Sequence, residues 1–263
     1  MKPHRPPRPP HAAPAAHTPP TEAHEKVFGL RAGLAVFESR RDDIVGVTFA
    51  PEVRRELAEL LRWAAARRVP VQEAPADRVA RAAESTHHEG LCVVTRARRW
   101  LPASSLADLL AKGPGACVAL DRVRNPYNVG AILRSAAFFG VDAALLGAPA
   151  PHPALPADAV RVAEGGAERL TLARTTDLAD TLQRLRARGV RVVGADGASK
   201  TSAVGFAFAR PCALVLGHER EGLSDRVRAQ CDAVVSIPGS GAVESLNVAV
   251  AAGVLISELV RPR

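Results

Sequence analysis

From Ala116 to the end of the sequence, short apolar segments alternate with longer amphipathic ones. The short segments predict strands at 116–121, 143–146, 170–172, 190–195, 212–216 and 233–237. The longer segments predict helices at about 128–139, 157–163, 176–188, 223–230 and 245–260. Strands that are apolar along their whole length are typical of a parallel sheet covered by helices on both faces. The alternation therefore predicts an α/β domain over residues 115–263.

A smaller α/β unit is predicted ahead of this domain, over residues 25–95. Its apolar periodicity predicts helices at 27–39, 51–68 and 77–85 and strands at 44–50, 69–73 and 91–95. This alternation favours a compact parallel or mixed sheet with helices. A cluster of Gly and Pro at 112–115 indicates a boundary, so residues 96–114 are predicted to be a linker with a short amphipathic helix around 106–110.

The first 24 residues differ from the rest of the chain. Eight of the 21 prolines fall within the first 20 positions, together with Lys2, Arg5 and Arg8. Such a segment has no apolar face to bury, so residues 1–24 are predicted to be a disordered basic Pro-rich tail. The tail is either a weak electrostatic arm for RNA or a dispensable extension.

The charge balance indicates a polyanionic partner. The 263 residues include 35 Lys and Arg against 27 Asp and Glu, which gives a formal net charge of +8. Nucleic acid is the usual partner of such a chain, although a genome that encodes arginine freely gives the same excess. Five arginines of the predicted helix at 51–68 form either an RNA surface or a solvated helix face: Arg54, Arg55, Arg62, Arg67 and Arg68.

The cysteines and the hydropathy pattern set the expected compartment. Cys92, Cys117, Cys212 and Cys231 have no metal-ligand spacing, so we expect no metal site and interpret them as small apolar residues, most of them buried. No apolar run is long enough to span a membrane, and no secretory signal pattern is present. We therefore expect a cytoplasmic protein in a reducing compartment, with no membrane partner.

The first of three segments that suggest chemistry is 120–134. It follows the strand that ends at Asp121, places Asn128 at the start of a helix and sets Arg134 among apolar residues. An arginine in such surroundings needs an anionic partner. That partner is either a phosphate or carboxylate of a ligand, or a structural carboxylate of the protein itself.

The second and third segments are loops that lead into helices. Residues 214–224 run from an apolar strand through Gly217 and Glu219, and ligands of open α/β sheets bind beyond the carboxyl ends of strands. Glu219 therefore orients a ligand or another side chain, or else caps its own loop. Residues 235–247 form a loop with two glycines, whose backbone can approach a ligand closely. Ser245 and Asn247 stand where polar residues open a helix, ahead of an almost wholly apolar run.

Together the three segments resemble the ordered motifs of the SpoU/TrmH family of RNA ribose 2′-O-methyltransferases. The resemblance covers about residues 116–260, and residues 25–95 resemble, at fewer positions, the substrate-binding domain that many members carry. It implies a SPOUT-type parallel α/β sheet with a C-terminal trefoil knot, preceded by a small α/β substrate-binding domain. It also implies S-adenosylmethionine as cofactor, ribosomal or transfer RNA as partner, and a homodimer. The residue pattern alone does not predict a knot, because knots are almost absent from proteins.

The resemblance also implies roles for individual residues. The catalytic set would be Asn128, Arg134, Glu219, Ser245 and Asn247, and the backbone that holds the methyl donor would be that of Leu216, Gly217, Ile237 and Leu246. Because arginine stays protonated in proteins, we interpret Arg134 as a clamp on the RNA phosphate rather than as a base. Many members have asparagine where this chain has His218.

Two other functional classes remain as alternatives. A non-catalytic RNA-binding protein would keep the same fold, although the presence of the five polar residues argues against it. A nicotinamide-dependent enzyme is disfavoured because no G-x-G-x-x-G follows the first strand of the larger domain. The sequence does not distinguish ribosomal from transfer RNA as the target.

Overall fold

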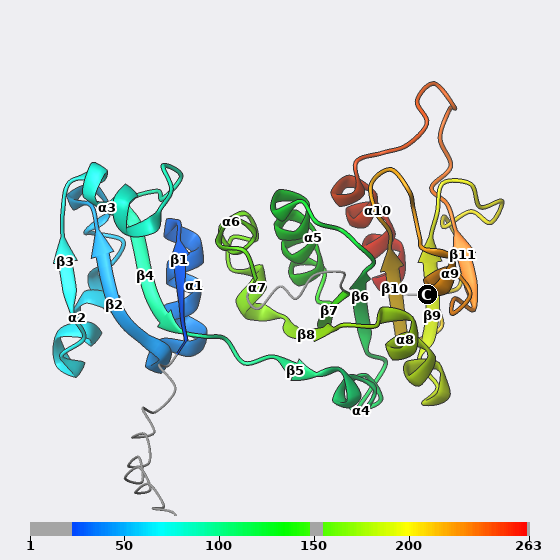
Figure 1. Ribbon diagram of the computed structural model, residues 1–263, viewed down its shortest axis with the longest axis horizontal. Helices are drawn as coiled ribbons and strands as arrows, with labels where there is room; N and C mark the ends of the chain where they lie inside the picture. The colour runs from blue at the N-terminus through cyan, green and yellow to red at the C-terminus, as the bar shows by residue number, and fades with distance from the viewer. Residues whose placement is uncertain (1–22, 148–154, 262–263) are drawn as a thin grey trace, which may run out of the picture.

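The structure is a computed structural model, which describes residues 23–147 and 155–261. Two sheets lie along the length of the molecule, each with its own helices (Figure 1). The first sheet and its helices, which we call the N-terminal domain, comprise β1 (His24–Phe28), α1 (Leu30–Arg40), β2 (Ile44–Phe49), α2 (Ala58–Arg67), β3 (Val71–Glu73), α3 (Ala76–Ala83) and β4 (Leu91–Arg96). Apart from residues 23 and 24, the predicted tail lies outside the described residues.

The N-terminal sheet is mixed and has the strand order β1-β4-β2-β3. β4 is antiparallel to both of its neighbours, whereas β2 and β3 are parallel. The prediction of a helix from Val27 was wrong at its start, because Val27 and Phe28 are buried in β1 and Val27 pairs with Val93. Gly29, with a φ of 99°, ends this strand, and the helix begins only at Leu30.

The second sheet and its helices form the C-terminal domain. They comprise β5 (Leu101–Pro102), α4 (Leu106–Leu110), β6 (Ala116–Leu120), α5 (Pro126–Phe138), β7 (Ala143–Gly147), α6 (Ala157–Val162), α7 (Gly166–Arg169), β8 (Thr171–Thr175), α8 (Leu178–Ala187), β9 (Arg191–Ala195), β10 (Cys212–Leu216), α9 (Asp225–Arg228), β11 (Ala233–Val235) and α10 (Val248–Val260). The predicted parallel α/β sheet is confirmed: its strand order is β11-β9-β10-β6-β7-β8-β5, and every neighbouring pair is parallel. The trefoil knot stays a prediction.

The strands of this sheet are apolar throughout because both of its faces are covered. In β6, Val118 belongs to the core that contains residues of α5 and α10, whereas Ala119 belongs to the core that contains residues of α8. Alternating side chains therefore fill two cores, as a doubly covered parallel sheet requires. No helix in the described part of the chain is long and apolar enough to cross a membrane.

The segment predicted as a linker, 96–114, contributes to the C-terminal domain. Leu101 pairs with Ala173 of β8, so β5 is the edge strand of the larger sheet. The predicted short helix is present as α4, and its Leu106 and Leu110 are fully buried in the core on the α8 face. Only a short extended stretch after β4 therefore runs between the two sheets (Figure 1).

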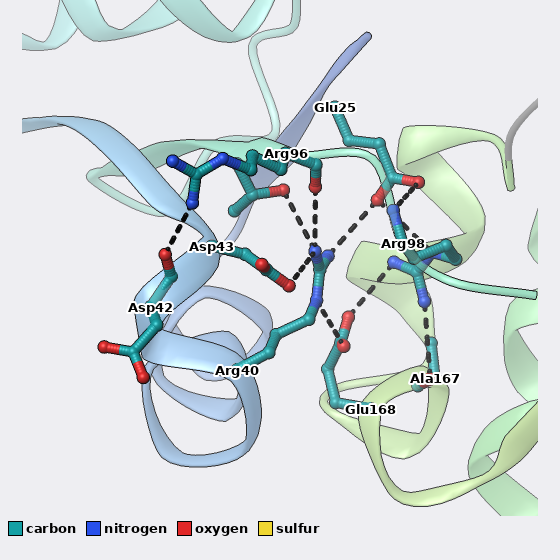
Figure 2. A network of polar contacts seen from close by, with 9 residues as sticks. Glu25, Arg40, Asp42, Asp43, Arg96, Arg98, Ala167 and Glu168 are labelled. Atoms are coloured by element: carbon teal, nitrogen blue, oxygen red, sulfur yellow. Dashed lines mark hydrogen bonds and ion pairs between the residues drawn. The ribbon is translucent and has the colours of Figure 1, made fainter. Parts of the chain in front are cut away.

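Four charged side chains meet where the two domains touch (Figure 2), and we call them the buried network: Glu25, Arg40, Arg98 and Glu168. Arg40 Nε lies 2.9 Å from Glu168 Oε2, and Arg40 Nη2 lies 3.2 Å from Glu25 Oε2. Arg98 Nη2 lies 3.1 Å from Glu168 Oε1, and Arg98 Nε lies 3.3 Å from Glu25 Oε2. The four side chains are 4–13% exposed, so each buried charge depends on its partners in the other domain or in the connecting segment.

Candidate functional site

The first two motifs meet at the point where the strand order of the large sheet reverses. β6 is followed on one side by β7 and β8, whereas β9 and β10 lie on its other side. β6 and β10 are parallel and in register, with Leu120 opposite Leu216, so their carboxyl ends are level. A ligand of an open α/β sheet binds at such a switch point. The loops that follow Leu120 and Leu216 therefore border one candidate site.

Three of the five predicted catalytic side chains form a hydrogen-bonded chain at this point. Asn247 Nδ2 donates to Asn128 Oδ1 at 3.1 Å, and Asn128 Nδ2 donates to Glu219 Oε1 at 2.9 Å. The amide of Asn128 thus uses one donor and one acceptor to hold its neighbours from the other two motifs. These three side chains come from α5, the loop after β10 and the start of α10.

The helix starts differ in detail from the prediction. Asn125, not Asn128, caps α5, and its Oδ1 accepts a hydrogen bond from Tyr127 N at 2.9 Å. Pro126 occupies the first position of the helix, where its missing N–H costs nothing, and Asn128 lies in the first turn. Asn247 caps α10 as expected, because its Oδ1 accepts from Ala249 N at 2.8 Å. The helix begins at 248 rather than 245.

The second motif folds into a tight loop whose shape depends on glycine and histidine. His218 N donates to Gly222 O at 3.0 Å, and Gly222 N donates to His218 O at 2.9 Å. A Cβ at Gly217 would overlap the backbone of Gly222, so no other residue fits there. His218 Nδ1 accepts from Arg220 N at 3.2 Å and from Glu221 N at 3.3 Å. His218 therefore orders its own loop.

Two residues that sequence reasoning did not assign to the site anchor this loop to β6. Asp121, which is 3% exposed, accepts a hydrogen bond from Ser224 N at 2.7 Å. Arg122 donates to the Glu221 carboxylate and, at 3.2 Å, to Gly222 O. A charged residue directly after a buried strand was the only sequence signal for Asp121, and Arg122 gave none. Together they hold the loop of Glu219 against the end of β6.

The predicted donor-binding positions differ in what their backbone groups do. Leu216 ends β10, and its carbonyl accepts from Asp121 N at 2.8 Å. In the described residues, no hydrogen bond within the protein uses the backbone of Gly217, Ile237 or Leu246. A long loop precedes α10 (Figure 1). Leu246 lies at its end and is 46% exposed. These free backbone groups suit a ligand that is recognised by main-chain contacts.

The structure does not bring Arg134 and Ser245 into the hydrogen-bonded chain. Ser245 is exposed and makes no hydrogen bond within the described residues. Arg134 was expected among apolar residues, but its side chain is 54% exposed, because its position on α5 faces away from the core. Its Nη1 lies 2.8 Å from Glu164 Oε1, so the alternative of a carboxylate partner is realised, on the surface rather than in the interior.

The thiols are poor candidates for chemistry. Burial raises the pKa of Cys117 and Cys212 to about 12 and that of Cys92 and Cys231 to about 11. Such thiols are protonated near neutral pH and are weak nucleophiles. Within residues 23–147 and 155–261, no group of three or more His, Cys, Asp or Glu side chains is arranged to hold a metal ion.

Comparison with known proteins gives two family matches and a relative that is similar over most of its length. Residues 115–257 match the SpoU rRNA Methylase family, and residues 26–101 match the family described as RNA 2′-O ribose methyltransferase substrate binding. The chain is 36% identical to a protein of Mycobacterium avium named as an uncharacterized tRNA/rRNA methyltransferase. That similarity covers 97% of this chain and 85% of the relative.

Two solved structures have a similar fold. The SpoU methyltransferase AviRb from Streptomyces viridochromogenes, solved in complex with AdoMet, is 26% identical, with a TM-score of 0.74 over 90% of this chain and 89% of that one. An rRNA methyltransferase from Sinorhizobium meliloti has a TM-score of 0.76 and 23% identity over 90% of this chain and 87% of that one. The similarity therefore includes both domains.

Proposed function

Because the chain belongs to the SpoU rRNA methylase family, we propose that it transfers a methyl group from S-adenosylmethionine to a ribose 2′-hydroxyl of ribosomal or transfer RNA. The observation that carries the proposal is the hydrogen-bonded chain of Asn247, Asn128 and Glu219 at the carboxyl ends of β6 and β10. Three segments far apart in sequence converge there, as a site for a donor and a nucleophile requires.

The proposed donor site is the backbone of Leu216, Gly217, Ile237 and Leu246. The free main-chain groups of the last three support this role, and the missing side chain of Gly217 lets the loop pack tightly against the backbone of Gly222. The related AviRb was solved with this donor. When bound, S-adenosylmethionine supplies an electrophilic methyl group on a sulfonium ion.

The protein side chains have to orient the ribose and stabilise the charge that develops on it. Methyl transfer would require the ribose 2′-hydroxyl to give its proton to water as its oxygen takes up the methyl group, with the donor sulfur keeping the electron pair of the broken bond. Asn128, Glu219, Ser245 and Asn247 are proposed to orient the ribose. Arg134 is proposed to hold the adjacent RNA phosphate, and its fixed positive charge favours the developing alkoxide.

We also propose that the protein is a homodimer. Its location would be the cytoplasm, where ribosomal and transfer RNA are found. The support for a dimer is an exposed apolar surface on the two helices that carry the site. Phe138 of α5 is 82% exposed, and Val250 and Val254 of α10 are 55% and 38% exposed. Exposed apolar side chains that lie together often mark a contact with another protein chain. Light scattering should give twice the chain mass, and Val254→Asp should shift it toward the monomer.

The proposal is tested with the Arg134→Ala variant and total RNA from cells that lack the protein. We expect loss of methyl transfer to RNA with donor binding, measured by calorimetry, largely unchanged. Mapping of ribose methylation in cells with and without the protein then identifies the nucleotide. Full activity of the variant would overturn the role of Arg134, and wild-type protein that does not bind the donor would favour a non-catalytic RNA-binding protein.

A further inference from the structure

The turn between α6 and α7 is wedged between the two domains. Gly165 faces α1 of the N-terminal domain, and a Cβ placed there would lie 2.8 Å from the Cβ of Ala35. Gly166 faces α5, and a Cβ there would lie 2.8 Å from Leu133 O. Two glycines therefore let one turn touch both helices at close range. The close packing of this turn against α1 and α5 also sets the position of the preceding residue, Glu164.

Glu164 bridges one arginine from each domain. Its Oε1 lies 2.8 Å from Arg134 Nη1 on α5, and its Oε2 lies 3.3 Å from Arg31 Nη1 on α1. Its backbone is in the left-handed region, with a φ of 45°, which is uncommon for a residue with a long side chain. The flanking turn therefore imposes a conformation that aims the carboxylate at both guanidinium groups.

All three side chains are accessible to solvent. The exposed fraction is 54% for Arg134, 73% for Arg31 and 32% for Glu164. An ion pair with this exposure contributes little to stability, because water and salt screen it. A stronger or better placed anion can therefore replace the carboxylate without disturbing the fold.

We propose that Arg31 and Arg134 together bind one phosphate of the RNA backbone, and that Glu164 occupies this site until the RNA replaces it. The inference rests on the proposed function, because it takes RNA as the substrate. A backbone phosphate carries one negative charge on oxygens that can accept from two guanidinium groups, as the Glu164 carboxylate does now. Arg31 is then a binding residue contributed by the N-terminal domain, and Glu164 is a positioning residue for Arg134.

Replacement of Glu164 by an RNA phosphate would make phosphate binding depend on both domains, because each domain contributes one arginine. A phosphate that bonds to both arginines can do so only while α1 and α5 keep their spacing, which the turn at Gly165 and Gly166 sets. The N-terminal domain would thus help to place the phosphate next to the reacting ribose, in addition to its own contacts with RNA. Rigid placement of this kind lowers the entropic cost of reaction.

The test measures binding of a fluorescein-labelled RNA hairpin by anisotropy, without methyl donor, over a range of KCl concentrations. Glu164→Gln removes the competing charge and should tighten binding at low salt by about two- to fivefold. Arg31→Ala and Arg134→Ala should each weaken binding by about five- to tenfold. Because both arginines contact the same phosphate, the double variant should lower the slope of log K against log salt by about one unit, not two.

The matched control is an exposed ion pair on the other face of the sheet. Arg184 and Asp180 of α8 lie 2.9 Å apart, and Asp180→Asn and Arg184→Ala change the net charge by the same amounts. These variants should leave the affinity and the slope unchanged. Unchanged or weaker RNA binding by Glu164→Gln, or the same gain from Asp180→Asn, would overturn the proposal.

The readout also separates this inference from the proposed function. A variant that only loosens the structure weakens binding, whereas Glu164→Gln is expected to strengthen it. If RNA binding changes as expected but the protein binds no S-adenosylmethionine, the phosphate site is supported and the proposed methyl transfer is contradicted. If RNA is methylated but Glu164→Gln and the double arginine variant bind RNA like the wild type, the phosphate site is contradicted while the proposed function is kept.

Discussion

Two networks of arginine and glutamate join the same two domains, and they differ chiefly in burial. In the buried network, Glu168 of α7 is 4% exposed and bonds to Arg40 and Arg98. In the exposed network, Glu164 is 32% exposed and bonds to Arg31 and Arg134. The two glutamates are only four positions apart in the chain. Residue type therefore does not determine whether an ion pair is structural or available to a ligand; access to water does.

The largest expected effect follows from removing one partner of the buried network. Glu168→Ala removes one of the two carboxylates that Arg40 and Arg98 share and leaves both arginines with Glu25 alone. One buried positive charge is then uncompensated, which costs about 3–5 kcal/mol. The free energy of unfolding in urea should fall by that amount, with a smaller loss for Glu168→Gln. Glu164→Ala is the control and should change the free energy of unfolding by less than about 1 kcal/mol. Equal losses of unfolding free energy in the two alanine variants would contradict the distinction between a buried, structural network and an exposed one.

The sequence pattern predicted the large domain well and its neighbour less well. Strands at 116–120, 212–216 and 191–195 were found within a residue of their expected limits, because doubly covered strands are uninterrupted apolar runs between polar loops. β1 was missed because Val27 and Phe28 also fit the apolar period of the helix that follows. Gly29 was the only local signal that separated the two elements.

The candidate site could be predicted only in part. The family resemblance assigned five residues to catalysis, and three of them, Asn128, Glu219 and Asn247, are joined by hydrogen bonds. The catalytic roles stay a prediction. The partner of Arg134 could not be predicted, because Glu164 lies 30 positions away in a turn with left-handed backbone and a pairing of this kind has no periodicity. The surroundings of Arg134 suggested burial because sequence proximity to apolar residues does not tell which face of a helix is exposed.

The second largest effect is expected at the turn between the two networks. Gly165→Ala places a side chain in the left-handed region, where φ is 94°, and against Ala35 of α1. The strain and the overlap should together lower the free energy of unfolding by about 1–3 kcal/mol. Gly189→Ala has a similar φ of 81° but no atom within 4 Å of the new Cβ, so it reports the backbone cost alone. If both variants lose the same stability, the close contact between the domains contributes nothing.

A smaller effect separates the networks by their response to salt. At about 0.5 M KCl the range of screened interactions is only a few ångströms. The two- to fivefold gain in RNA affinity expected for Glu164→Gln should therefore disappear, because the competing pair is solvent-exposed. The loss of stability in Glu168→Ala should persist, because buried charges are screened much less. A destabilisation by Glu168→Ala that vanishes with salt would show that water reaches the buried network.

The smallest effect concerns a solvent-exposed ion pair next to the buried network, Lys26 and Glu84. Lys26 follows Glu25 in β1 and points the other way, and its Nζ lies 2.6 Å from Glu84 Oε1. The hydrogen bond and the charge of Lys26 hold the pKa of the Glu84 carboxyl below its usual value of 4.5. A lowered pKa contributes stability that is present above the unfolded value and is lost as the pH falls through the folded value. Lys26→Ala should therefore flatten the dependence of the unfolding free energy on pH between about 5 and 3.

The pKa of Glu84, followed by NMR titration, should rise toward its usual value in this variant. Glu84→Gln should flatten the same pH dependence. If the unfolding free energy of both variants falls between pH 5 and 3 as steeply as that of the wild type, this exposed pair does not contribute to stability.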